Sequence, residues 1–501
     1  MPESNTIKPH NRKLFVLGIC LLMLNAPIVS ANSSWENDID AEFEAFNNKQ
    51  KADFQRYQSE QNKAFLKLLE SQWREFTVFQ GIEPPIKPKP RTIPKVQAQI
   101  DMPVNKASLA AHVLPRIISE ANKITPQNIR STSTRIEPQG QPIEISYYGK
   151  KITLYYDESI KVALNGRPSQ QSIQEFYHAI NASNFTPLLH QIQDIKFNLR
   201  LSDWGYIQFT HQIAQQLFNN ENEAKLFSTL LLNETNYDIR VAYEGDNIYQ
   251  LASTRTKLFK VLYFSFDDTN YYLINLDGRK QSINKLYTYE ANAPQSFHPV
   301  DFIVRQPPLL SENSKSKNLR FNYNGHDYEL KVHFNRAIID YFNSYPRTEL
   351  SVYFSSVISQ ELNDSLLSAL GEIIRDKNEL EAANILLRFV QTAFEYKTDE
   401  EQFGYEKYFF SEELFQYKYS DCEDRSVLFS YLVKQLLNLD VAIVDYPDHV
   451  ATAIRFTEKV EGANFLVNDG IYTLSDPTYM NADVGMVMPK YANIKASVTP
   501  L

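Results

Sequence analysis

The chain has 501 residues, of which 51 are Lys or Arg and 60 are Asp or Glu, so its formal net charge is -9. A hydrophobic fraction of 43% excludes a wholly disordered chain, and at roughly 100–200 residues per domain the length predicts two to four domains. The acidic balance argues against nucleic acid as the main partner. The 14 glycines form no phosphate-binding loop, HExxH is absent, and the histidines show no spacing typical of metal ligands. We therefore expect neither a metal nor a cofactor.

Residues 1–31 have the features of a secretory signal peptide. The basic residues Arg12 and Lys13 precede an apolar run over 14–24 and a small-residue cleavage site at 29–31. The run is too short to span a bilayer comfortably, and no later stretch approaches twenty apolar residues. The sequence therefore predicts export across the inner membrane to the periplasm, with no transmembrane span after signal removal. An uncleaved anchor is the alternative.

Residues 33–80 predict a long amphipathic helix, because large apolar residues recur every eleven residues. Eleven residues make three helical turns, so each set stays on one stripe. The two sets are Trp35, Phe46, Tyr57, Leu68 and Phe79, and Phe43, Phe54, Phe65 and Phe76. Such a stripe must be buried, either by self-association as a stalk or coiled coil or by docking on a protein partner. A proline-rich segment over 82–98 follows and predicts a stiff linker.

The rest of the chain looks duplicated. Residues 143–154 resemble residues 319–330, since both read as two alternating strands around a central glycine. Residues 219–228 can be laid over residues 421–430, and the two matches occur in the same order. Each copy reads as a β-hairpin, then helices, then a long helix followed by three or four strands. The pattern predicts a tandem repeat.

The predicted fold class is α+β, with a long helix and a linker followed by two tandem α+β units. The first unit is expected over 100–295 and the second over 365–501, each with a preceding β-hairpin region. Residues 296–364 are expected to form a β-rich linking region. An amphipathic helix is expected over 107–124.

Cys422 is the only cysteine left once the signal sequence and its Cys20 are removed. It opens a predicted helix for which Ser420 or Asp421 is the natural N-cap. Unpaired backbone N–H groups and the helix dipole favour an anion in the first turn, which lowers the pKa of a thiol there. The position therefore predicts a nucleophilic thiolate.

A histidine and a carboxylate follow at suitable places. His449 lies at the start of a predicted strand, and Asp476 lies at the end of a predicted hairpin. Together with a thiol they suit a nucleophile–base–orienter relay. Asp445 and Asp448 are rival acids, although their setting beside a proline turn favours solvated loop carboxylates.

These three motifs resemble the transglutaminase-like superfamily over residues 365–490. Cys-x-Asp opens a helix, His-Val opens a strand and Asp-Pro-Thr follows a strand. The resemblance implies a papain-like core in which Cys422 is the nucleophile, His449 the base and Asp476 the orienting acid. The chain departs from the commoner pattern at Glu423, where a small residue often follows the cysteine, and the histidine is followed by valine rather than an aromatic residue.

The oxyanion donors are less defined. The backbone N–H of Cys422 is one, and Gln416, Tyr417 or Tyr419 supplies a second. A surface role for Gln416 remains the alternative. The aromatic segment 400–419 is expected to build the wall of the cleft.

The first copy is predicted to be catalytically dead. The repeat register places Asn220 at the cysteine position and Asn247 at the histidine position, and Asn275 falls at the acid. Asparagine is neither a thiolate nor a general base, so this copy is expected to pack, bind or position.

Two functions remain open. The first is an exported cysteine hydrolase or acyltransferase that acts on peptide or side-chain amide bonds, with a peptide, a protein or a cell-wall peptide as substrate. The second is a non-catalytic periplasmic scaffold or binding protein that uses both modules and the docking helix.

Overall fold

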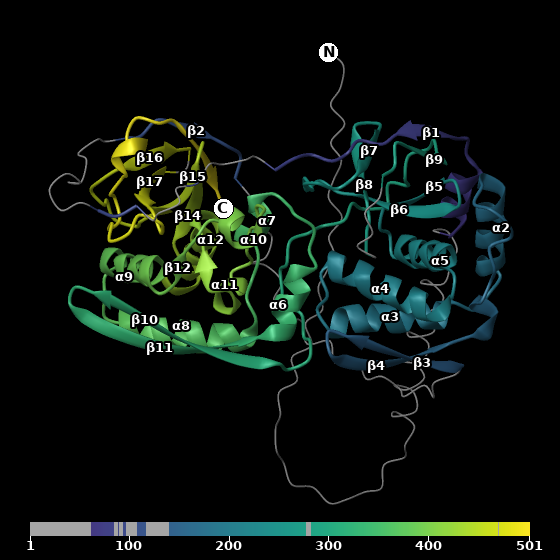
Figure 1. Ribbon diagram of the computed structural model, residues 1–501, viewed down its shortest axis with the longest axis horizontal. Helices are drawn as coiled ribbons and strands as arrows, with labels where there is room; N and C mark the ends of the chain where they lie inside the picture. Colours follow the sequence, from purple (N-terminus) through teal and green to yellow (C-terminus); the bar gives the residue numbers. More distant parts are fainter. Residues whose placement is uncertain are drawn as a thin grey trace, which may run out of the picture. The chain divides into compact units, whose positions relative to one another are not determined.

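Two six-stranded sheets organise the part of the chain that the structure describes (Figure 1). The structure is a computed structural model that describes residues 62–84, 89, 94–96, 108–116, 140–276, 282–468 and 470–501. These residues belong to one of two compact units of the chain, Ser59–Leu501. The predicted signal peptide and residues 33–61 of the predicted long helix lie outside the described residues.

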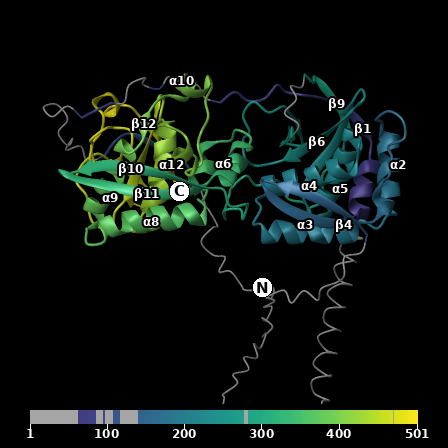
Figure 2. The same cartoon turned by 60° about the horizontal axis from the view of Figure 1, so that its bottom comes forward.

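The first half of this unit consists of a sheet, a helical layer and a hairpin. Its strands lie in the order β1-β9-β5-β6-β8-β7, and all neighbours are antiparallel. Helix α5 packs on β5 and β6, α4 packs on α5, and the hairpin β3–β4 covers α3 and α4 (Figures 1 and 2). The bounds are β1 Trp73–Thr77, β3 Gln141–Tyr147, β4 Lys150–Tyr156, α2 Gln170–Asn181, α3 Thr186–Asn198, α4 Asp203–Leu217, α5 Glu221–Glu234, β5 Ile239–Glu244, β6 Asn247–Ser253, β7 Tyr263–Phe266, β8 Thr269–Leu273 and β9 Lys285–Tyr289.

The second half has the same kind of layers. Its sheet has the order β16-β17-β15-β14-β18-β2, with β2 parallel to β18 and the other neighbours antiparallel. Helix α12 packs on β14 and β15, α9 packs on α12, and the hairpin β10–β11 covers α8 and α9. The bounds are β2 Ala111–Val113, β10 Ser314–Tyr323, β11 His326–Asn335, α6 Arg336–Asn343, α7 Leu350–Phe354, α8 Gln360–Ile374, α9 Glu379–Thr392, β12 Glu395–Tyr396, α10 Asp399–Phe403, α11 Glu413–Gln416, β13 Tyr419–Ser420, α12 Cys422–Leu437, β14 Asp440–Tyr446, β15 His449–Arg455, β16 Asn464–Val467, β17 Gly470–Ser475 and β18 Ala496–Pro500.

The two sheets have one strand order in common. The order β1-β9-β5-β6-β8-β7 matches the order β2-β18-β14-β15-β17-β16, except that the edge strand β1 is antiparallel to its neighbour and β2 is parallel. In each half a helix, α5 or α12, comes before five of these six strands in the chain. The expectation of a mixed α+β fold is confirmed, and the hairpins expected at 143–154 and 319–330 are β3–β4 and β10–β11.

The predicted helix over 33–80 is wrong beyond residue 70. Residues 62–70 are helical, but Trp73–Thr77 form the edge strand β1, which pairs with β9. Phe65 and Phe76 are both buried, but on different elements, whereas Phe79 is 48% exposed. The eleven-residue stripe therefore does not continue as one helical face, because pairing with β9 satisfies the backbone of 73–77 instead.

The helix expected over 107–124 is also wrong where the structure describes it. Ala111–Val113 are the extended strand β2, and they extend the sheet of the second half. The first predicted unit, 100–295, therefore includes a strand that belongs to the other half. The linking region 296–364 contains the hairpin β10–β11 as expected, but also α6 and α7.

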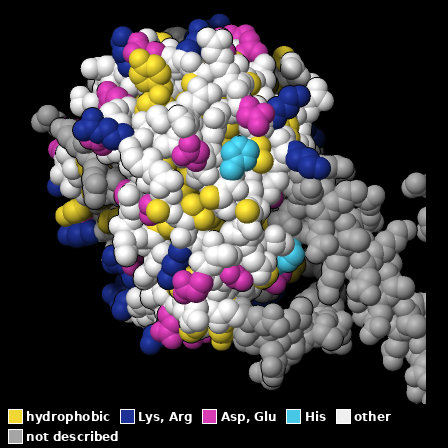
Figure 3. All heavy atoms as spheres, turned by 90° about the vertical axis from the view of Figure 1, so that its right-hand side faces the viewer, with side chains coloured by type: hydrophobic (Ala, Val, Ile, Leu, Met, Phe, Trp, Pro, Cys, Tyr) yellow, Lys and Arg dark blue, Asp and Glu magenta, His cyan; other side chains and the backbone are white. Residues whose placement is uncertain are grey.

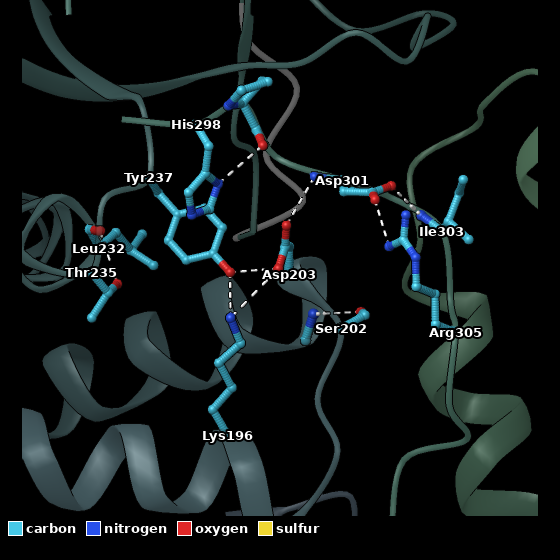
Figure 4. Close-up of polar contacts among 12 residues, drawn as sticks. Lys196, Ser202, Asp203, Leu232, Thr235, Tyr237, His298, Asp301, Ile303 and Arg305 are labelled. Carbon is cyan, nitrogen blue, oxygen red and sulfur yellow. Dashed lines mark hydrogen bonds and ion pairs between the residues drawn. The ribbon is translucent and has the colours of Figure 1, made fainter. Parts of the chain in front are cut away.

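A polar cluster holds the chain between the halves against the first half (Figure 4). Asp203, the first residue of α4, accepts hydrogen bonds from the Tyr237 hydroxyl through Oδ1 and from the Asp301 N–H through Oδ2, the latter at 3.0 Å. Lys196 Nζ also contacts Tyr237 and lies 3.5 Å from Asp203 Oδ1. Arg305 pairs with Asp301 at 2.6 Å. Asp203 of α4, itself contacted by Lys196 of α3 and by Tyr237 from the loop between α5 and β5, thus holds the backbone at Asp301.

Helix α6 continues this joint. Tyr341 Oη lies 2.6 Å from Ser202 Oγ, and Trp204 Nε1 donates to the Ser344 carbonyl at 3.1 Å. A Cβ at Gly205 would lie 2.9 Å from Cε2 of Tyr341, so the glycine permits this close approach.

The surface of the first half carries no dominant patch on the face seen in Figure 3. Acidic, basic and hydrophobic side chains are interspersed there. Of the helices that the structure describes, none combines the length and the apolarity needed to cross a bilayer.

Candidate active site

Cys422 is the first residue of α12, the buried helix of the second half. Asp421 is the N-cap, and its N–H donates to the Asp424 carboxylate at 3.2 Å. The other oxygen of Asp424 accepts the Phe409 N–H at 2.9 Å, so the segment expected to form the cleft wall packs on the start of this helix. Of the two predicted N-caps, Ser420 and Asp421, the structure confirms Asp421.

His449 and Asp476 form a buried pair. His449 begins β15, Asp476 follows β17, and Nε2 of the histidine lies 2.8 Å from Oδ2 of the aspartate. Asp476 Oδ1 accepts the N–H groups of Thr478 and Tyr479 at 2.9 and 3.2 Å, which fixes the orientation of the carboxylate. The ring of Tyr491 stacks on the imidazole, with centroids 5.2 Å apart. The acid and base expected from the sequence are therefore brought together.

The start of α12 lies against the start of β15. Ser426, one helical turn after Cys422, donates its hydroxyl to the carbonyl of Val450 at 3.2 Å, and Val450 directly follows His449. His449 Nδ1 is buried and has no hydrogen-bond partner within the described part of the chain. The histidine thus has one nitrogen held by its acid and the other unengaged.

The thiol is turned toward a different group. Cys422 Sγ donates to Oε2 of Glu423 at 2.8 Å, and no hydrogen bond between Cys422 and His449 is present among the described residues. Burial, the neighbouring Glu423 charge and the Asp421 charge raise the pKa of Cys422 well above its usual value, against the opposing effect of Lys89. The lowered thiol pKa expected from the helix dipole is therefore wrong for this arrangement. Desolvation and two adjacent carboxylates outweigh the partial charge of the helix end.

A buried acidic cluster surrounds the start of α12 and holds an ammonium group. Lys89 Nζ lies 2.6 Å from Asp421, 2.8 Å from Glu423, 2.7 Å from Glu406 and 3.8 Å from Asp399. Burial alone would lower the pKa of Lys89, but its attraction to Asp421 and Glu423 raises it well above the usual value.

Like charges accumulate in this cluster. Burial and the nearby acids raise the pKa of Asp399 to about 11, while burial and Glu423 raise that of Asp421 to about 7 against the effect of Lys89. Oxygens of Asp399, Asp421 and Asp424 lie within 4.8 Å of one another, as do the ligand atoms of Asp421, Cys422 and Glu423. Such groups suit a cation, and in this structure the neighbouring cation is the Lys89 ammonium.

The triad is shut off from solvent. The exposed fractions of Cys422 and His449 are both 0%, and that of Asp476 is 3%. A cavity of about 740 Å³ beside residues 455–462 contains none of the three. The described conformation is therefore closed.

The three residues expected as oxyanion donors lie in the segment that leads into α12. Gln416 ends α11, Tyr417 donates its hydroxyl to Asn343 at 3.0 Å, and Tyr419 lies in β13. None of the hydrogen bonds among the described residues joins these three to Cys422 or His449.

The rival acids have different surroundings. Asp445 lies in β14 rather than in the turn, so the loop setting expected for it is wrong. Asp448 accepts from the Tyr491 hydroxyl at 3.0 Å and contacts Lys490.

The three asparagines of the first half occupy corresponding elements. Asn220 caps α5 by accepting the Asn222 N–H at 2.9 Å, Asn247 begins β6, and Asn275 follows β8. The corresponding elements of the second half carry Cys422, His449 and Asp476. Asn220 is the N-cap of α5, whereas Cys422 is the first residue of α12. Asn275 lies two residues after β8, whereas Asp476 directly follows β17. The elements therefore correspond, and the residue register matches for Asn247 and His449, which each begin a strand.

Three features of the site around Cys422 were not predicted from the sequence: the contact of Lys89, the stacking of Tyr491 and the effect of the flanking acids on the thiol. Lys89 sits in a proline-rich segment, where a lysine is normally a solvated charge, and only the fold brings it to α12. Nothing in the sequence around Tyr491 indicated that its ring stacks on His449. The run from Asp421 to Asp424 did give a signal, because three acids flanking a cysteine oppose thiolate formation.

No protein-family model, curated protein sequence or solved structure matches the chain.

Proposed function

We propose that the protein is an exported cysteine hydrolase or acyltransferase of transglutaminase-like type. The observation that carries this proposal is the 2.8 Å pair between His449 Nε2 and Asp476 Oδ2, with Nδ1 of the same ring left for the thiol. An acid that fixes one imidazole nitrogen and orients the other toward a nucleophile is the arrangement of a thiol relay. The position of Cys422 at the helix start, one turn from the Ser426–Val450 contact, supports the assignment of the nucleophile.

The proposed reaction is acyl transfer from an amide. Cys422 passes its proton to His449, the sulfur attacks the carbonyl carbon, and the tetrahedral oxyanion is stabilised by first-turn N–H groups, including that of Cys422. His449 then gives the proton to the leaving nitrogen, the C–N bond breaks and a thioester remains. Water or an amine attacks the thioester and restores the thiol.

The shared strand order supports two tandem transglutaminase-like units, of which the first is non-catalytic. Asn220, Asn247 and Asn275 provide neither a nucleophile nor a base at the corresponding places. The first unit would position the second, because α6 and the segment at Asp301, which lead into the second half, are hydrogen-bonded to it. Export to the periplasm rests on residues 1–31 alone.

One observation favours the second function, a non-catalytic scaffold. Cys422 and His449 are fully buried, and the thiol pKa is raised rather than lowered. A scaffold tolerates a sealed thiol, whereas an enzyme with this site must open before substrate enters.

Acylation by p-nitrophenyl acetate separates the two functions. For the enzyme we expect release of p-nitrophenol with an acetyl group on Cys422, detected by mass spectrometry, and about hundredfold slower acetylation in His449→Ala. His326→Ala, at the exposed start of β11, is the matched control and leaves the rate unchanged. Equal acetylation of the wild type and His449→Ala contradicts the relay and leaves the scaffold.

A further inference from the structure

Lys89 is an unusual occupant of the site beside Cys422. It comes from the linker rather than from a helix or strand, yet its side chain is only 3% exposed. Its ammonium contacts four carboxylates, and the Tyr408 ring lies 5.9 Å away. The ammonium is therefore buried among acidic side chains, as a buried cation requires.

The ammonium is connected directly to the thiol. Oε2 of Glu423 lies 2.8 Å from Lys89 Nζ and also accepts the S–H of Cys422 at 2.8 Å. Lys89 thus holds the carboxylate that keeps the sulfur engaged away from His449.

The linker is anchored on the other side of the triad as well. The Pro94 carbonyl accepts the Met480 N–H at 2.8 Å, and the Val96 N–H donates to the Met480 carbonyl at 3.0 Å. Met480 lies four residues after Asp476. The described linker residues therefore attach to the start of α12 at one point and to the segment after the acid at another.

We propose that Lys89 is an intramolecular latch whose ammonium fills an alkylammonium-binding pocket formed by Asp399, Glu406, Asp421 and Glu423. While the latch is in place, Cys422 stays bonded to Glu423 and the triad stays closed. Removal of the ammonium vacates the space that it fills and releases Glu423 from the contact that holds it beside the sulfur, so water enters and the thiol becomes accessible. An alkylammonium group of comparable length then occupies the vacated pocket. The consequence for activity rests on the proposed function, but the latch itself concerns only access to the sulfur.

The test compares Lys89→Met with Lys95→Met in the full chain. Lys95 lies in the same linker and is exposed, so its substitution removes the same charge without touching the pocket. We expect iodoacetamide to label Cys422 at least tenfold faster in Lys89→Met than in the wild type or Lys95→Met. Equal rates in the two folded variants overturn the latch.

The ligand class is tested with n-butylammonium chloride as the probe. In Lys89→Met we expect 20 mM n-butylammonium to slow labelling several-fold, whereas n-butanol, which has the same stem without charge, has no effect. Protection by calcium chloride but not by n-butylammonium overturns the alkylammonium assignment.

A second variant guards against misfolding of Lys89→Met, checked by circular dichroism. Glu406 has the most exposed side chain of the four acids that contact Lys89, at 21%, and Glu406→Gln weakens the latch from the rim. We expect it to accelerate labelling by a smaller factor, and an unchanged rate counts against the latch. If Lys89→Met is labelled faster but acetylation of Cys422 does not depend on His449, the latch is supported and the relay is refuted. If Lys89→Met is labelled at the wild-type rate while His449→Ala slows acetylation, only the latch is refuted.

Discussion

His449 Nε2 lies 2.8 Å from Asp476 Oδ2 in a region that is almost fully buried, whereas Cys422 is bonded to Glu423. His449 and Asp476 are thus already paired while the thiol is bonded elsewhere. Two backbone N–H groups hold the second oxygen of Asp476, which fixes the orientation of the carboxylate. The proposed relay therefore requires the thiol, rather than the imidazole–carboxylate pair, to change its partner.

Asp476→Asn should lower acetylation of Cys422 on the order of 10³-fold, because an amide fixes the wrong imidazole tautomer and does not stabilise the imidazolium. The rate of p-nitrophenol release measures the effect. Asp448→Asn is the control, since Asp448 bonds Tyr491 rather than the imidazole. A larger loss in Asp448→Asn than in Asp476→Asn would identify Asp448 as the acid.

Asn220→Ala should leave labelling and acetylation of Cys422 unchanged and should cost about 1 kcal/mol of stability, because it removes the N-cap of α5. Urea denaturation measures the loss. Asn220→Asp should retain the stability, because aspartate also caps a helix. Loss of labelling at Cys422 in Asn220→Ala would show that the first half takes part in the chemistry.

Glu234→Gln should remove a pH dependence of stability. Burial raises the pKa of Glu234 from 4.5 to about 8, and its Oε2 has no hydrogen-bond partner within the described residues. A raised folded-state pKa gives stability that is fully present below about pH 4.5 and is lost as the pH rises through about 8. The wild type should lose up to about 4 kcal/mol more than Glu234→Gln between pH 5 and 8.

Urea midpoints at pH 5, 6.5 and 8 measure this difference. Glu144→Gln, on the exposed face of β3, serves as control and should follow the wild type. Parallel pH curves for the wild type and Glu234→Gln would show that Glu234 is ionised in the folded protein.

Gly205→Ala and Gly371→Ala should have opposite effects on stability. A Cβ at Gly205 overlaps the ring of Tyr341, whose hydroxyl bonds Ser202, so we expect a loss of about 1–3 kcal/mol. A Cβ at Gly371 in α8 meets only Leu436 at 3.7 Å, so the better helix propensity of alanine should give a gain of about 0.5–1 kcal/mol. Thermal unfolding measures both, and equal shifts would contradict the close approach of α6 to α4.

The hairpins and the elements around the triad were predictable because their signals are local. Gly149 and Gly325 both have φ of +80°, which glycine adopts without strain, and each lies between alternating strands. The start of α12 and strands β14 to β17 follow from capping, apolar periodicity and turn residues. His449 and Asp476 could be paired because the order of their motifs has a family precedent.

The predictions that were wrong depend on contacts between residues that are distant in the sequence. Phe76 fits an eleven-residue helical column as well as an edge strand, and only β9, far along the chain, decides between them. The three-residue strand β2 is too short to leave a pattern. The raised pKa of Cys422 depends first on burial, which the residues around the cysteine do not reveal, and then on Glu423, which directly follows it in the sequence.

The placement of β1 and β2 sets an order for folding as the chain emerges from its N-terminus. The sheet of the first half can be completed once β9 has been synthesised, whereas β2 must wait for β18, close to residue 501. The sheet of the first half can thus be complete before Cys422 is synthesised, and α6 packs directly against that half. Because its flanking strand pairs last, the half that carries the thiol is the slower one to mature.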